Sequence, residues 1–426
     1  MTHPAPLTKE WRPAPSTPWL GEVLLGAVGA VHGELPAIAL RAPGGMRRSA
    51  RTVAPGVSDL DPTEQLAAVN PSTTAAVNRL GLPEAERAVV ILVDGLGQCN
   101  LQARGERAPF LTSEFLSQTG QSAYPSTTAA NISFLGTGVK PGQTAMAGYT
   151  VRNPDTGKVM NLISWAGGMD PLEWQRVPTV FERMQRAGAR SAHVSTWRFE
   201  RSALTQAALR GAEYIAAETL AERVDATAEL LQHTDTKVAY LYWAEIDAVG
   251  HLHGWQTPEW DRELEHLDGE IARLVSLLPP GTLVLLTADH GMVDVPQGAS
   301  NTFGGPARID VNAHAELSRG LDLVAGENRF LHLFTREPDE VARRWEDFLG
   351  ERARIYSRAE AFNAGLFGPV RPDVADVVGD VIVALLGDLS IADRSRVSEG
   401  MFALPGLHGS VTEWERAVPI LSLLTS

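Results

Sequence analysis

Three unbroken apolar runs, each closed by an aspartate, constrain the fold of this chain more than any other feature. They read RAVVILVD (87–94), KVAYLYWAEID (237–247) and TLVLLTAD (282–289). A strand with one face in water alternates apolar and polar residues, whereas a continuous apolar run is typical of a strand covered on both faces. We therefore interpret these runs as strands of a buried, mostly parallel sheet.

Segments with helical spacing alternate with these strands. Residues 179–196 are predicted to form a helix, a glycine-containing turn and a strand, and residues 220–234 and 259–281 to form two further helices. This alternation predicts an α/β fold in which a mostly parallel central sheet carries helices on both faces. Because ligands of such sheets bind outside the carboxyl ends of the strands, we expect the three aspartates at one rim.

Composition and pattern divide the chain into four segments. Residues 1–80, rich in Pro, Ala and Gly, are expected to cover the main domain, and residues 81–295 to form its α/β core. Residues 296–403 are expected to form a small inserted α+β subdomain, and residues 404–426 to return to the core. The subdomain is expected to pack beside the rim of acids and to shape a pocket there.

Charge and cysteine content limit the partners and the compartment. The formal net charge is -14 and no run of Lys or Arg occurs, which argues against binding to nucleic acid or to an anionic membrane. The apolar stretch 19–31 is too short to span a bilayer, and we interpret it as a buried helix rather than a targeting segment. Cys99 is the only cysteine, which suits a reducing, cytoplasmic location. The sequence predicts no oligomeric state.

Histidines accompany two of the strand-end acids. His290 follows Asp289 directly, and His251 follows Asp247 at a spacing that places both side chains on one face of a helical turn. A further histidine stands in a turn near the C-terminus. The candidate metal ligands are Asp94, Asp247, His251, Asp289, His290 and His408.

This mixture of carboxylate and imidazole groups suits Zn²⁺, with Mn²⁺ or Fe as alternatives, and disfavours Ca²⁺. The candidate ligands are too many for one tetrahedral ion and enough for two ions with open positions. Taken singly, each feature has a simpler interpretation: a turn after a strand, a capped strand end, or a pair of residues on a surface helix. Their joint position at the strand ends favours a metal centre.

The stretch SAYPSTTAANISFLGTGVKPG (122–142) offers a nucleophile. A turn precedes a segment of helical character that begins with hydroxyl side chains. The start of a helix presents unpaired N–H groups and a positive dipole end, which favour a phosphate or an alkoxide. An ordinary threonine N-cap is the simpler alternative. Beside a metal pair, the stretch indicates a threonine alkoxide activated by coordination.

The motifs VDGLG, YPSTTAANISFLGTGVKPG, DAVGHLHG, TADHGM and LHGS, in this order, resemble those of the alkaline phosphatase superfamily, in particular its nucleotide pyrophosphatase/phosphodiesterase branch. The resemblance covers roughly residues 87–310 and the tail from 404. It implies two zinc ions and a threonine nucleophile. One zinc would be held by Asp94, Thr128, Asp289 and His290, and the other by Asp247, His251 and His408.

The same resemblance selects Thr128 rather than Thr127, since the branch places an Asn three residues after the nucleophile and a Thr-Gly pair nine after it. Counting from Thr128 gives Asn131 and Thr137-Gly138. The expected role of Asn131 is to donate a hydrogen bond to a non-bridging phosphate oxygen. The sequence departs from the branch at Ala129 and Ala130, where an aromatic-Pro pair is usual, and no aromatic residue for stacking on a nucleotide base is recognisable.

The predicted function is hydrolysis of phosphodiester or pyrophosphate bonds in a small phosphate-ester substrate. Phosphomonoesterase relatives use Ser and an Arg that is not identified here, and phosphonoacetate-type hydrolases share the Thr, the Asn and the ligand set, so both remain alternatives. Sulfatase activity is not expected, since Cys99 lacks the Pro and Arg needed for conversion to formylglycine. A non-catalytic metal-binding protein is the alternative of another class, and the intact candidate nucleophile argues against it.

Overall fold

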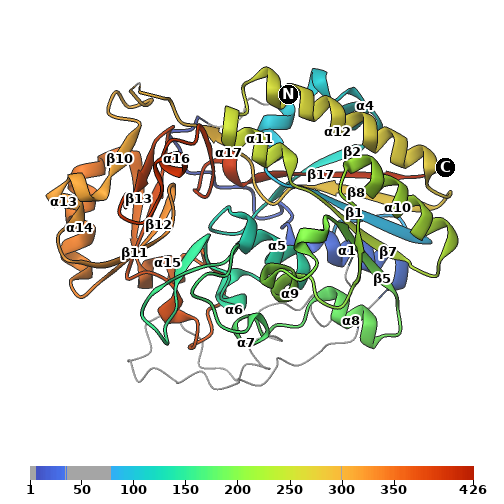
Figure 1. Ribbon diagram of the computed structural model, residues 1–426, viewed down its shortest axis with the longest axis horizontal. Helices are drawn as coiled ribbons and strands as arrows, with labels where there is room; N and C mark the ends of the chain where they lie inside the picture. Colours follow the sequence, from blue (N-terminus) through green and yellow to red (C-terminus); the bar gives the residue numbers. More distant parts are fainter. Residues whose placement is uncertain (1–5, 34, 36–77, 299) are drawn as a thin grey trace.

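The computed structural model describes residues 6–33, 35, 78–298 and 300–426 (Figure 1). Most of the predicted covering segment 1–80 therefore lies outside the described residues. Within it, the apolar stretch 19–31 forms α1 (Gly21–His32), most of whose side chains are buried. Among the described residues, no helix is both long and apolar enough to cross a membrane.

A seven-stranded central sheet forms the larger part of the molecule. Five neighbouring strands run parallel, and β17 lies antiparallel between β8 and β2, so the predicted mostly parallel α/β sheet is confirmed. In spatial order the strands are β2 (Leu116–Gln121), β17 (Ala417–Leu424), β8 (Thr282–Thr287), β1 (Arg87–Val93), β7 (Val238–Trp243), β5 (Ser191–Ser195) and β6 (Glu213–Ala216).

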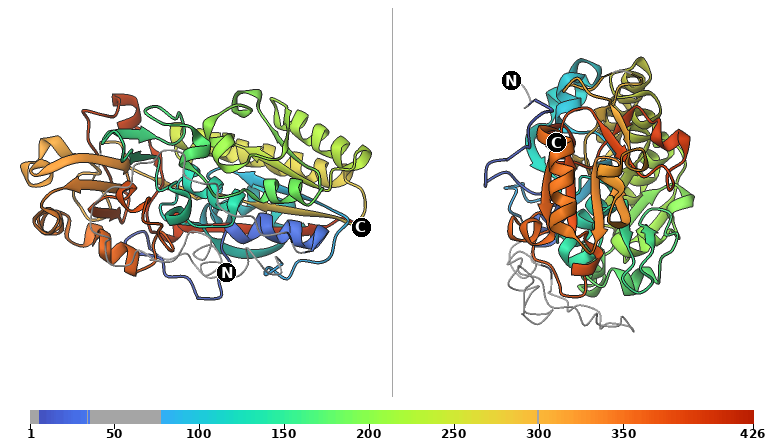
Figure 2. Two further views of the ribbon diagram at one scale, coloured as in Figure 1. Left: turned by 90° about the horizontal axis from the view of Figure 1, so that it is seen from below. Right: turned by 90° about the vertical axis from the view of Figure 1, so that its left-hand side faces the viewer.

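Helices cover both faces of this sheet, as predicted (Figure 2). Along β1, Val90 and Leu92 belong to one buried cluster, and Val89 and Ile91 to another on the opposite face. The first cluster includes residues of α1, α5 (Thr128–Thr137) and α8 (Val180–Arg186). The second includes residues of α10 (Leu220–His233) and α12 (Pro258–Leu277). Burial on both faces explains why the strand is apolar without alternation.

A six-stranded antiparallel sheet lies beside the central sheet (Figure 1). Its order is β13 (Ala353–Ser357), β14 (Val381–Leu385), β12 (Phe330–Thr335), β11 (Leu321–Glu327), β3 (Thr150–Arg152) and β4 (Val159–Asn161). α14 (Pro338–Leu349) and α13 (Ala315–Ser318) pack on one face. The sequence did not predict β3 and β4, which come from outside 296–403 and pair with the rest through Thr150 and Gly326. The predicted segment boundaries stay predictions.

Short elements complete the chain. Two small two-stranded sheets pair β10 with β15 and β9 with β16. Their strands are β9 (Val293–Asp294), β10 (Arg308–Asp310), β15 (Ser390–Ala392) and β16 (Gly406–Leu407). Among the described residues, the remaining α-helices are α3 (Gln98–Ala103), α4 (Pro109–Glu114), α6 (Pro141–Thr144), α7 (Pro171–Trp174), α9 (Ala203–Ala208), α11 (Glu245–His253), α15 (Arg358–Asn363), α16 (Glu399–Phe402) and α17 (Glu413–Arg416).

Candidate active site

The three predicted acids lie at the carboxyl ends of neighbouring strands, at the rim that faces the second sheet. Asp94 follows β1 directly, and its N–H donates to the carbonyl of Trp243 at 2.8 Å. Asp289 lies two residues beyond β8. Asp247 differs from the prediction because β7 ends at Trp243, so this acid stands in the first turn of α11 rather than at the strand end.

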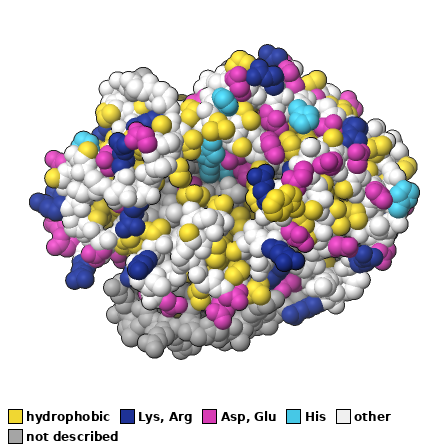
Figure 3. Space-filling view, viewed as in Figure 1, with side chains coloured by type: hydrophobic (Ala, Val, Ile, Leu, Met, Phe, Trp, Pro, Cys, Tyr) yellow, Lys and Arg dark blue, Asp and Glu magenta, His cyan; other side chains and the backbone are white. Residues whose placement is uncertain are grey.

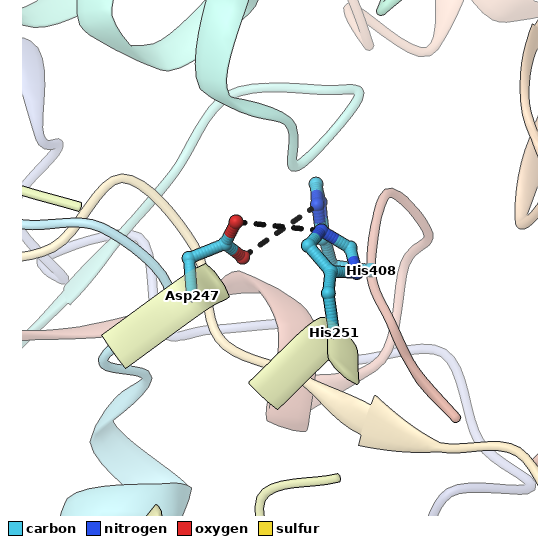
Figure 4. Close-up of side chains that lie close together, drawn as sticks. All are labelled: Asp247, His251 and His408. Atoms are coloured by element: carbon cyan, nitrogen blue, oxygen red, sulfur yellow. Dashed lines mark ion pairs between the residues drawn. The ribbon is translucent and has the colours of Figure 1, made fainter. Parts of the chain in front are cut away.

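Asp247, His251 and His408 form one side-chain group (Figure 4). The helical spacing within α11 brings His251 Nε2 to 3.3 Å from Asp247 Oδ2. His408 Nε2 lies 4.0 Å from Asp247 Oδ1. His408 is placed by two pairings: Leu407 of β16 pairs with Val293 of β9, and Gly409 forms a bridge with Ser126. The turn near the C-terminus is thereby held between the candidate nucleophile loop and the chain beyond β8.

Asp94, Asp289 and His290 form a second, buried group. His290 Nε2 lies 3.2 Å from Asp94 Oδ1 and 3.5 Å from Asp289 Oδ2. The two groups adjoin, since the rings of His290 and His408 stack with centroids 3.6 Å apart. All the predicted metal-ligand side chains thus converge at one place, from segments that are far apart in the sequence.

All three histidines are oriented by backbone carbonyls. The Nδ1 atoms of His251, His290 and His408 lie 2.7, 3.1 and 2.9 Å from the carbonyl oxygens of Gly406, Gly291 and Ser126. A carbonyl can only accept, so each Nδ1 carries a proton, and each Nε2 is the ring atom that faces the acids and could bind a metal. This carbonyl–imidazole arrangement is the usual support of metal-bound histidine.

The charges of the two groups suit divalent cations. Asp94 Oδ1, Asp247 Oδ1 and Asp289 Oδ2 are buried without a hydrogen-bond partner in the described part of the chain. Burial, the neighbouring Asp94 charge and that of Asp247 raise the pKa of Asp289 well above its usual range. Burial lowers the pKa of His290, but the charges of Asp289 and Asp94 outweigh this effect and raise it to about 10. Carboxylates clustered with imidazole groups provide ligand atoms and excess negative charge that suit divalent cations.

The hydroxyl group of Thr128 contacts the buried group of candidate ligands. It is the first residue of α5, where backbone N–H groups lack intrahelical acceptors, and its Oγ1 lies 3.2 Å from His290 Nε2. Thr127 is the N-cap residue and its side chain makes no capping hydrogen bond within the helix. Both threonines line the pocket described below. The contact with His290 favours Thr128 as the nucleophile.

Asn131 lies in the first turn of α5, three residues after Thr128. Its side chain is fully buried, its Nδ2 donates to the carbonyls of Pro125 and Thr127 at 3.1 and 3.2 Å, and its Oδ1 accepts from the Ala123 N–H at 2.7 Å. Both amide hydrogens are therefore donated to backbone carbonyls in this structure, and the donation to a phosphate oxygen stays a prediction. The amide holds together the loop that precedes Thr128.

Sequence reasoning missed two side chains beside the centre. The hydroxyl of Tyr242 donates to Asp94 Oδ2 from β7, where the residue reads as part of an apolar strand. Glu327 lies largely covered at the end of β11, with Oε2 3.9 Å from His408 Nδ1, and burial raises its pKa to about 8. No local pattern could have found Glu327, because it comes from the second sheet.

Three further histidines and the cysteine belong to neither candidate ligand group. His253 is exposed on α11, and Cys99 is a buried free cysteine. His332 is buried between the Ala147 carbonyl and the Gly379 N–H, and His193 packs on Tyr240, so both have structural roles.

The Tyr242 hydroxyl should increase the affinity of the centre for metal, because it fixes one oxygen of Asp94. We expect Tyr242→Phe to weaken zinc binding about 10- to 100-fold in a competition titration with a chromophoric chelator. Tyr240→Phe is the matched control, since Tyr240 is a buried neighbour on the same strand whose hydroxyl has no hydrogen-bond partner among the described residues. Equal losses in the two variants would show a general packing effect and contradict this role.

A buried ion pair contacts the two turns that carry His290 and His408. Arg329 donates from Nε and Nη2 to the Glu415 carboxylate at 2.7 and 3.0 Å, and both side chains are fully buried. The carboxylate also accepts from the Ser410 N–H at 2.9 Å, two residues beyond His408. The Glu415 carbonyl accepts from the Gly291 N–H at 2.9 Å. One residue thus connects the second sheet to both histidine-bearing turns.

A pocket of about 730 Å³ opens from the centre toward the second sheet. Its lining includes Asp94, Thr128, Asp247, His251 and His408. In the space-filling view, histidine side chains lie in the hollow between the two parts of the molecule, with hydrophobic side chains around it (Figure 3). A substrate in this pocket would have its reactive atom at the acids and its remainder against the second sheet.

A family model described as type I phosphodiesterase/nucleotide pyrophosphatase matches residues 88–399. The chain belongs to this family. The predicted enzyme class, a phosphodiesterase/nucleotide pyrophosphatase-type hydrolase of the alkaline phosphatase superfamily, is thereby confirmed. The family is metal-dependent, and both candidate metal groups lie within or beside the matched range. No curated protein matches the chain in a sequence search.

Solved structures of this family and its superfamily share the fold. Murine ectonucleotide pyrophosphatase/phosphodiesterase 5, solved as an inactive variant with AMP, is 16% identical, with a TM-score of 0.62 over 79% of this chain and 87% of its own. The human protein of the same name is 15% identical, with a TM-score of 0.61 over 79% of this chain and 87% of its own. Phosphonoacetate hydrolase from Sinorhizobium meliloti 1021, solved with phosphonoformate, is 20% identical, with a TM-score of 0.60 over 79% of this chain and 89% of its own. At these identities the likeness shows the fold alone.

Proposed function

We propose that this phosphodiesterase-family protein cleaves phosphodiester or pyrophosphate bonds of small phosphate esters through Thr128, with two Zn²⁺ ions as cofactors and Mn²⁺ or Fe as alternatives. The observation that carries the proposal is the 3.2 Å contact of Thr128 Oγ1 with His290 Nε2, where two groups of candidate ligands adjoin. Asp94, Asp289 and His290, together with Thr128, would hold one ion. Asp247, His251 and His408 would hold the other.

The chain's own residues would carry the reaction in two displacements. Thr128 Oγ attacks phosphorus as the bond to the leaving oxygen breaks, and the hydroxyl proton passes to solvent. A water molecule then cleaves the phosphothreonine ester and restores the hydroxyl. Bound divalent cations would favour the threonine alkoxide and offset the charge on the attacking and leaving oxygens. The N–H groups at the start of α5 would stabilise charge on the phosphoryl oxygens.

A comparison of three substrates on one preparation tests this function. We expect the zinc-loaded protein to hydrolyse bis-p-nitrophenyl phosphate with a higher kcat/KM than p-nitrophenyl phosphate or phosphonoacetate, and to lose the activity when a chelator removes the metal. Faster turnover of the monoester or of the phosphonate would favour the corresponding alternative activity. Bound zinc without turnover of any of the three would favour the non-catalytic alternative. The cytoplasmic location stays a prediction.

A further inference from the structure

Part of the pocket lining, called here the aliphatic wall, consists of apolar side chains. Side chains from β4, β11, β15 and the segments that follow them line it: Val159, Ile163, Val324, Ile391, Val397 and Met401. Ile163 and Met401 are 36% and 39% exposed, so both side chains can be reached from the pocket by a bound molecule. The wall therefore offers apolar contact to whatever extends from the phosphoryl position.

The polar groups of the pocket do not favour a nucleotide or a polyphosphate tail. Its lining has two aromatic residues, Tyr149 and Tyr242, and the second donates its hydroxyl to Asp94. Arg396 is the one cationic side chain other than histidine in the described lining, and it pairs with Asp393 at 3.3 Å. Glu327 adds a buried carboxyl group at the same end as His408. A second phosphate would meet acids rather than an unpaired cation.

We infer that the substrates are phosphate esters whose organic group is an alkyl chain, bound with the phosphoryl group at the acids and the chain along the aliphatic wall. The inference rests on the proposed function and narrows it from phosphodiesters and pyrophosphates to phosphate esters that carry an alkyl group. Each methylene that leaves water for this wall should tighten binding about three- to fourfold. A polar group of the same length should not increase the binding affinity at this wall.

Binding of alkylphosphonates to the zinc-loaded protein, measured by calorimetry, tests the inference with probes that carry a single organic group. From methyl- to hexylphosphonate we expect the dissociation constant to fall on the order of 100-fold or more, if each added methylene contributes as above. Phosphonoacetate should bind more weakly than propylphosphonate. Equal affinities of methyl- and hexylphosphonate would overturn the inference and leave the proposed function standing. If neither inorganic phosphate nor methylphosphonate binds, the proposed function fails, and this inference fails with it.

Two variants test whether the dependence of affinity on chain length comes from the aliphatic wall or from apolar side chains elsewhere on the surface. Ile163→Asn combined with Met401→Gln changes two partly exposed positions, so the fold should be retained. The double variant is expected to reduce the dependence on chain length while the affinity for methylphosphonate stays unchanged. Leu116→Gln is the matched control, because Leu116 is 77% exposed on β2 and does not line the pocket. An unchanged chain-length dependence in the double variant would place the alkyl chain elsewhere and overturn the inference.

Discussion

Thr128→Ala should lower kcat for bis-p-nitrophenyl phosphate by about four orders of magnitude or more, because a nucleophile that forms a covalent intermediate cannot be replaced by a methyl group. The expected result is a nearly inactive protein that still binds zinc through the remaining carboxylates and imidazoles of both groups. Steady-state hydrolysis and zinc content, measured on the same preparation, check this outcome.

Thr127→Ala is the control for this prediction. Thr127 precedes the nucleophile by one residue, lines the same pocket and makes no capping hydrogen bond within α5, so its loss should reduce kcat far less. Full activity in Thr128→Ala, or a larger loss in Thr127→Ala, would show that the nucleophile is assigned to the wrong hydroxyl.

Of the substitutions considered, Glu415→Gln should lower the free energy of unfolding most. The substitution leaves the buried guanidinium of Arg329 without its carboxylate, and breaking a buried pair in this way costs about 3–5 kcal/mol in the free energy of unfolding. The hydroxyl of Thr412 also donates to this carboxylate, at 2.6 Å, so several contacts weaken together. Chemical denaturation of the metal-loaded variant and of the unaltered protein measures the difference.

An exposed ion pair provides the comparison for Glu415. Glu340 pairs with Arg343 at 2.9 Å on the surface of α14, where both side chains are 59% exposed. Solvent screens such a pair, so Glu340→Gln should leave the free energy of unfolding unchanged within error. A similar, small effect of both substitutions would contradict a structural role of the Arg329–Glu415 pair behind the two histidine-bearing turns.

The sequence predicted the central sheet and the candidate ligands because both depend on local patterns. Continuous apolar runs predicted strands that are buried on both faces, and β1 follows this pattern from Ala88 to Val93. The i, i+4 spacing of Asp247 and His251 was sufficient to predict their contact within α11. The convergence of acids followed from the rule that parallel strands end at one rim.

The parts that the sequence did not predict depend on contacts between distant segments. Asn131 has the expected spacing from Thr128, yet spacing along a helix does not show which side of the loop receives the amide. Glu327 and Arg329 approach the centre from the second sheet, whose register no local pattern encodes. The strands β3 and β4 have three residues each, too few to carry a recognisable period.

Anomalous X-ray diffraction from crystals of the active, zinc-loaded protein tests the metal pair most directly. Two zinc peaks are expected: one enclosed by Asp94, Asp289 and His290 beside the Thr128 hydroxyl, the other by Asp247, His251 and His408. Active crystals with no anomalous peak inside either group, or with the His408 imidazole turned away from Asp247 and His251, would contradict the account.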